Sequence, residues 1–119
     1  MKRLKVLVSL VFIFLAAAVT SGVGAGAQKR GAASQAERGR AVYEAKCARC
    51  HGADGAGHTR MAEIVEPPDM SDAAWQRKRS NARMVASVTN GLGQMPAFKK
   101  KLSRQEIAAA VAHVRTLRR

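Results

Sequence analysis

Aromatic residues are scarce in this sequence: 119 residues include three Phe, one Trp and one Tyr. Two of the three Phe fall in an apolar N-terminal segment, so Tyr43, Trp75 and Phe98 are the aromatics left to build a core. A small domain with so little core material often gains stability from a bound group. The composition therefore predicts one small domain folded around something besides its own side chains.

Signals for β-structure are also missing, because no stretch alternates apolar and polar residues with period two, and there are no internal repeats. Helix-capping sequences occur instead at Ser34–Glu37, at Ser71 or Asp72, at Ser80 and at Ser103–Glu106. The last of them opens a helix with an apolar face at 3.6-residue spacing, formed by Ile107, Ala110, Val111, Val114 and Leu117. We therefore predict an all-α domain of about four short helices joined by long loops, with a short turn near residues 61–65.

The N-terminus has the pattern of a secretory signal. Lys2, Arg3 and Lys5 precede an apolar run at 6–19, and an A-x-A-like cleavage site follows at 25–27. This pattern predicts export to the periplasm.

The same pattern suggests how the chain is divided. We expect residues 1–27 to be a cleaved signal peptide, residues 28–33 a flexible lead-in and residues 34–119 the folded domain. The alternative is a retained membrane anchor facing the periplasm. It stays open because the uncharged stretch at 6–27 reaches the roughly 20 residues that cross a bilayer.

Acidic residues are few: 8 Asp and Glu stand against 21 Lys and Arg, a formal net charge of +13. Such a charge favours acidic protein surfaces, anionic membranes or nucleic acid. Nucleic acid is not expected, because no binding motif or series of stacking aromatics accompanies the basic residues. The basic clusters at 77–79, 99–101 and 115–119 are therefore expected to form either a solvated basic surface or a docking face for acidic partner proteins.

The chain has only two cysteines, Cys47 and Cys50, and His51 directly follows the second. Positions i, i+3 and i+4 of a helix share one face, so the three side chains should point the same way. Two thiols can add to the two vinyl groups of a haem while the imidazole reaches the iron, and C-x-x-C-H is the signature of this attachment. The motif predicts one covalently attached haem c.

Three other uses of these residues compete with haem attachment. A disulfide is allowed in an exported protein but does not explain the adjacent His51. A closed zinc site needs four ligands, and His58 is the one further candidate nearby. A thioredoxin-like thiol centre needs a βαβ setting, which the sequence lacks.

Five features in sequence order resemble the bacterial class I cytochromes c with one haem. They are the helix with Gly39 and Tyr43, the motif at 47–52, the loop at 67–71, the Gly-x-Gly-x-Met-Pro segment at 91–96 and the final helix. The resemblance covers residues 34–118 and implies the class I fold, in which the first and last helices cross closely. Gly39 would then allow contact with Ala110 and Val111. His113 departs from the family, which usually has an aromatic residue in the last helix.

The resemblance also implies a second protein ligand to the iron. Met95 is the favoured residue, because Gly91 and Gly93 let the backbone lie against a flat macrocycle and Pro96 stiffens it just beyond. The other candidates are Met61, Met70, Met84, His58 and His113.

Each competing candidate has another expected role. Met84 should be part of the core, and Met70 should pack at the haem edge. His58 should be exposed, and His113 should pack against the first helix.

Weaker expectations concern the surroundings of the haem. The resemblance implies that the carbonyl of Pro67 or Pro68 accepts a hydrogen bond from His51. Trp75, with a basic residue at 77 or 79, should hydrogen-bond the haem propionates. Phe98 should shield the haem face near Met95.

An iron held by His51 and Met95 has no open position, so we expect one-electron transfer and no enzymatic activity. The favoured function is a carrier in a bacterial periplasmic or respiratory chain that docks with acidic redox partners. One alternative is the cytochrome subunit of a periplasmic dehydrogenase or sulfur-oxidising complex. Another is a haem sensor or peroxidase, if Met95 dissociates easily.

Overall fold

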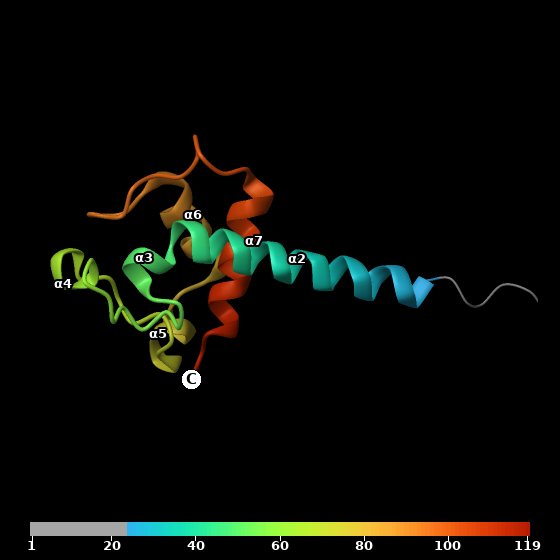
Figure 1. The fold of residues 1–119 in the computed structure, drawn as a ribbon, viewed down its shortest axis with the longest axis horizontal. Helices are drawn as coiled ribbons and strands as arrows, with labels where there is room; N and C mark the ends of the chain where they lie inside the picture. Colours follow the sequence, from blue (N-terminus) through green and yellow to red (C-terminus); the bar gives the residue numbers. More distant parts are fainter. Residues whose placement is uncertain (1–23) are drawn as a thin grey trace, which may run out of the picture.

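The regular secondary structure of the described part is helical, and long loops join the helices. The computed structural model describes residues 24–119, with side chains described from Ser34 onward. The helices in chain order are α2 (Gly24–Lys46), α3 (Ala48–His51), α4 (Ala62–Val65), α5 (Ala73–Lys78), α6 (Asn81–Asn90) and α7 (Arg104–Thr116). Within residues 24–119 the β-structure is limited to an isolated bridge between Leu92 and Met95. The predicted all-α class is therefore confirmed (Figure 1).

Helices α2 and α7 cross closely, and the other helices gather on the side of the crossing away from the projecting N-terminal part of α2 (Figure 1). A Cβ atom on Gly39 would lie 2.8 Å from the carbonyl carbon of Ala109 and closer still to its oxygen, so a larger residue would force the helices apart. The close approach predicted at Gly39 is confirmed. The atoms nearest to that position belong to the backbone of Ala109, a residue that the prediction of Ala110 and Val111 did not name.

Helix α2 begins at Gly24, upstream of the predicted capping box at Ser34. The box therefore lies inside a helix and does not start one, and residues 28–33 are helical where a flexible lead-in was expected. The reason is local: residues 27–33 contain no proline and are mostly Ala, Gln, Lys and Arg, which favour helix on both sides of a cap-like sequence.

The predicted signal peptide at 1–27 falls almost entirely outside the described residues. Residues 24–119 include no helix that is both long and apolar enough to cross a membrane. The choice between a cleaved signal and a retained anchor stays a prediction.

Three of the remaining helices start at predicted caps. Asp72 accepts a 2.6 Å hydrogen bond from the backbone N–H of Trp75, and Ser80 caps α6. Ser103 and Glu106 form a complete capping box at the start of α7. Short helix α4 occupies the predicted turn, and Glu66 ends it in the left-handed region, at φ 45°, just before Pro67.

The core centres on Tyr43, whose side chain is fully buried. The buried residues around it are Met70, Met84, Val111 and Val114. The predicted apolar face of α7 and the core role of Met84 are confirmed. Cys47 packs against this cluster, so the core extends to the C-x-x-C-H motif.

Candidate functional site

The C-x-x-C-H motif lies where α2 ends and the single turn of α3 begins. The backbone N–H groups of Cys50 and His51 both donate to the carbonyl of Cys47, at 3.1 and 3.0 Å. This helical turn places the three side chains on one face, as the spacing predicted. Gly52, at φ 78°, then ends the turn in a conformation that favours glycine.

The chemistry of these side chains separates the competing uses of the motif. Cys47 and Cys50 are both free and half-buried, so they form no disulfide. Among the described residues no group of His, Cys, Asp and Glu could hold a metal ion by itself, so a protein-only zinc site is not assembled. Two free thiols and one imidazole on a single turn are the groups that attach haem c and ligate its iron.

Burial favours the neutral forms of Cys47 and His51. Desolvation, followed by the charge of neighbouring Cys50, raises the pKa of the Cys47 thiol to about 11. Burial also lowers the pKa of His51. At neutral pH the imidazole is therefore uncharged, which is the form that donates a lone pair to iron.

One nitrogen of the His51 ring, Nδ1, is buried and has no hydrogen-bond partner. The predicted bond from His51 to the carbonyl of Pro67 or Pro68 is therefore not formed in this structure. Pro67 is nevertheless close to the motif. A Cβ atom on Gly57 would lie 3.5 Å from Pro67, and the N–H of Gly57 donates to the carbonyl of His51 at 2.8 Å. An orphaned, buried imidazole nitrogen is costly, and it fits a ring whose final position depends on a further bound group.

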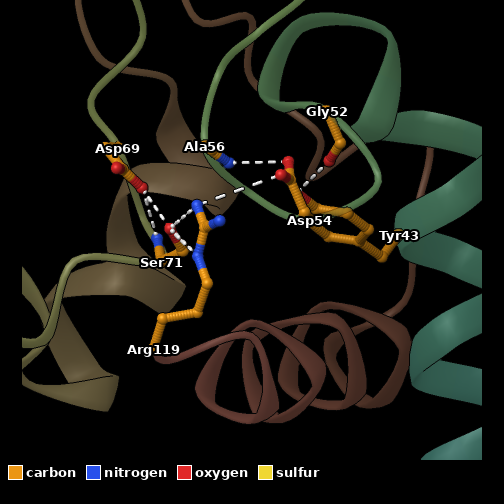
Figure 2. Close-up of polar contacts among 7 residues, drawn as sticks. All are labelled: Tyr43, Gly52, Asp54, Ala56, Asp69, Ser71 and Arg119. Atoms are coloured by element: carbon orange, nitrogen blue, oxygen red, sulfur yellow. Dashed lines mark hydrogen bonds and ion pairs between the residues drawn. The ribbon is translucent and has the colours of Figure 1, made fainter.

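The loop that follows the motif is held by hydrogen bonds that sequence reasoning missed. The hydroxyl of Tyr43 donates to the carbonyl of Gly52 at 2.7 Å in the buried core (Figure 2). Burial raises the pKa of Tyr43, so this hydroxyl stays protonated and able to donate. Thr59 Oγ1 donates to the carbonyl of Cys50 at 3.1 Å, which fixes the motif from its other side.

Arg119 connects this loop to a second loop near residue 70. Its guanidinium donates to the hydroxyl of buried Ser71 at 2.7 and 3.1 Å and lies 3.9 Å from a carboxylate oxygen of Asp54 (Figure 2). Ser71 in turn donates to Asp69 at 2.5 Å, and these hydrogen bonds lower the pKa of the Asp69 carboxyl. No local sequence signal marks this network, because its members come together only in the fold.

Met95 lies in a tight turn between α6 and α7. Leu92 and Met95 exchange backbone hydrogen bonds of 3.1 and 3.0 Å, and the Met95 side chain is half-buried. Gly91, at φ 80°, faces this turn, since a Cβ there would lie 2.7 Å from the Met95 carbonyl oxygen. Phe98, expected to shield the haem, is buried nearby, and its N–H donates to the carbonyl of Val88 at 2.9 Å.

The structure gives the surroundings of the competing ligand candidates. Met70 and Met84 belong to the buried core around Tyr43. The ring of His113 lies 5.1 Å from that of Tyr43, so its predicted packing against the first helix is confirmed. His58 is exposed, as predicted, and Met61 is half-buried.

Trp75 is half-buried and packs against the core. Of its two basic neighbours, Arg79 lies over the indole, with its guanidinium carbon 6.0 Å from the ring centroid. Arg77 lines a separate pocket with Arg115. Arg79, and not Arg77, is therefore the basic residue that lies beside Trp75.

Comparison with known proteins agrees with this geometry. The family described as cytochrome C oxidase, cbb3-type, subunit III matches residues 34–114. A cytochrome c6 of Rippkaea orientalis is 32% identical over 114 residues, covering 96% of this chain and 92% of that protein. The cbb3-type oxidase subunit CcoP of Azospirillum brasilense is 34% identical over 86 residues. That match covers 71% of this chain and only 29% of the subunit.

Comparison with a solved structure supports the same fold. The KustC0563 c-type cytochrome superposes with a TM-score of 0.64 at 34% identity, covering 68% of this chain and 98% of that one. The fold and site thus define a c-type cytochrome of class I. The chain belongs to the family of the cbb3-type subunit III and cytochrome c6 domains, and its Cys47, Cys50 and His51 fit one covalently attached haem c.

Proposed function

We propose that this cytochrome is a one-electron carrier whose single haem c is held by Cys47, Cys50, His51 and Met95. The observation that carries the proposal is the α3 turn, which presents two free thiols and a neutral imidazole on one face. The Met95 turn supplies the second ligand from the other end of the chain. When bound, haem c supplies an iron that changes between two oxidation states.

The ligand pair explains why transfer of electrons is favoured over catalysis. With both Met95 and His51 as ligands, the iron would have no open position for oxygen or substrate. A thioether favours the reduced iron, and an apolar surround also disfavours the extra charge of the oxidised state. Gly91 and the paired backbone of the turn restrict movement of Met95, so the ligand needs little rearrangement between states.

The residues around the haem complete this arrangement. The carbonyl of Pro67 or Pro68 would accept from His51 Nδ1 once the ring turns toward it. Trp75 with Arg79 would neutralise the propionates, and Phe98 would shield the face near Met95. The proximity of Pro67 to the His51 loop supports Pro67 over its neighbour.

The partners we propose are acidic redox proteins. A lysine cluster, defined as Lys99, Lys100 and Lys101, lies exposed immediately after the Met95 loop. Long-range attraction between this cluster and carboxylates would speed encounter and weaken with salt, since the Debye length falls from about 10 Å at 0.1 M to about 3 Å at 1 M.

The periplasm is the proposed location, with the N-terminal segment as the export signal.

The relatives allow a second function, in which the chain is the cytochrome subunit of a larger complex. This is favoured by the match to CcoP, a subunit of an oxidase, of which the chain spans 29%. A tight stoichiometric partner on purification would identify it, whereas a carrier would purify alone. We propose that the chain has no enzymatic activity of its own.

The test is the visible spectrum of haem-loaded protein, reduced, before and after carbon monoxide. We expect a low-spin spectrum that carbon monoxide leaves unchanged, because Met95 would hold the position that carbon monoxide needs. Met95→Ala should then bind carbon monoxide, whereas Met61→Ala, the matched control at another half-buried methionine, should not. Ready binding by the unaltered protein would favour a sensor or peroxidase. Failure to attach haem covalently would overturn the proposal.

A further inference from the structure

A pocket of about 400 Å³ lies between α5 and the end of α7, lined by Gln76, Arg77, Arg115 and Arg118. None of the residues that would attach or ligate the haem lines it. Three of its four lining residues are arginines, and none is acidic. The pocket is thus a second strongly basic site, separate from the lysine cluster.

The floor of the pocket is rigid. Buried Gln76 donates through its amide nitrogen to the carbonyls of Met70 and Val114, both at 2.8 Å. Arg115 donates to the side-chain oxygen of Asn81 and to the carbonyl of Gln76, each at 2.7 Å, and to the carbonyl of Arg79. All of these acceptors are neutral, so they orient the guanidinium without cancelling its charge.

The walls of the pocket carry positive charge with no internal counter-ion. Among the described residues the ion pairs are Arg40 with Glu44 and Arg119 with Asp54, so no carboxylate lies within 4.0 Å of the pocket arginines. The side chains of Arg77 and Arg118 are exposed and make no hydrogen bond or ion pair within residues 34–119. Three like charges around one hollow repel one another, and a bound anion would remove that repulsion.

We propose that this pocket binds a small phosphate-bearing anion. A guanidinium offers planar, paired N–H donors that match phosphate oxygens, which is why arginine is preferred over lysine for phosphate recognition. Arg115 is already oriented by its hydrogen bonds, so its side chain loses little conformational entropy on binding. Arg77 and Arg118 would contact the anion from α5 and from the end of α7. The volume admits more than a single phosphate, and the lining offers guanidinium groups but no aromatic surface for a base, so the class is a polyphosphate.

The experiment is calorimetric titration of tripolyphosphate into the haem-loaded protein at low salt. We expect one saturable site, with a Kd that rises at least tenfold in Arg77→Gln and in Arg118→Gln. Both side chains are exposed and unpaired, so the variants should retain the fold, which the far-ultraviolet and visible spectra would check. Lys100→Gln removes the same charge from the lysine cluster and should change the Kd less than twofold.

Three results would overturn the proposal. One is the absence of saturable binding at millimolar tripolyphosphate. Another is equal weakening by Lys100→Gln, which would mean a diffuse charge effect. The third is that binding of a poly-glutamate peptide depends on the same arginines while binding of tripolyphosphate does not. That result would make the pocket a protein-docking site. The inference does not depend on the proposed electron-carrier function.

Discussion

Replacing Gly39 by alanine tests the crossing of α2 and α7, on which the fold rests. The added Cβ would meet the backbone carbonyl of Ala109, with 2.8 Å to its carbon. A backbone atom cannot move aside as a flexible side chain can, so α7 must shift as a whole. Overpacking of this kind typically costs 1–3 kcal/mol, and a rigid neighbour places the cost at about 3 kcal/mol.

Helix propensity acts in the opposite direction, because alanine is favoured over glycine by about 1 kcal/mol in a helix interior. The net loss should therefore be about 2 kcal/mol. For a domain of this size that corresponds to a fall in Tm of about 8–16 °C. Propensity alone would give a gain of stability, so the sign of the change decides between the two effects.

The assay is urea unfolding of the haem-loaded protein followed by circular dichroism at 222 nm. Ala41→Gly is the matched control: Ala41 is exposed in the interior of the same helix, so it reports propensity alone and should lose about 1 kcal/mol. A Gly39→Ala protein as stable as the unaltered one, or more so, would refute the close crossing.

Three further predictions follow from the contacts described above. Tyr43→Phe leaves the buried Gly52 carbonyl without its donor and should cost about 1–2 kcal/mol in the same urea assay, whereas no loss would show that water replaces the hydroxyl. Burial lowers the pKa of His113, with Glu44 and Arg40 acting in opposite directions, so its neutral form is favoured by folding. The contribution of His113 to stability should be complete above its pKa in the unfolded chain, about 6.5, and should be lost as the pH falls through its lower pKa in the folded protein. His113→Phe should therefore flatten the fall of Tm at acid pH. Reversing the lysine cluster to glutamate should slow electron transfer to an acidic partner at low salt, and an unchanged rate would exclude this cluster from docking.

Features encoded by neighbouring residues could be predicted well. The caps at Ser80 and Ser103, the apolar face of α7 and the shared face of Cys47, Cys50 and His51 each depend on a few adjacent positions. The start of α2 was predicted wrongly because a capping sequence reports local preference, and helix-forming residues upstream override it.

Features that depend on the relative position of distant elements were missed. The phase of the α2 and α7 crossing selects Ala109 over its neighbours, and sequence spacing does not specify that phase. The bonds from Arg119 to Ser71 and from Arg115 to Gln76 join segments far apart in the chain, and polar pairs of this kind leave no periodic signal. The missing bond of His51 Nδ1 depends on a ring orientation that the motif alone does not determine.

The end of α7 is fastened to the segment at 70–76 through several bonds at once. Gln76 joins Met70 to Val114, and the backbone N–H of Arg119 donates to the carbonyl of Ser71 at 2.9 Å. Elements tied in this way open and close together as one cooperative unit. The loop beside Trp75 and the last turn of α7 should therefore open with a common free energy, which amide hydrogen exchange would measure as similar protection factors in the two segments.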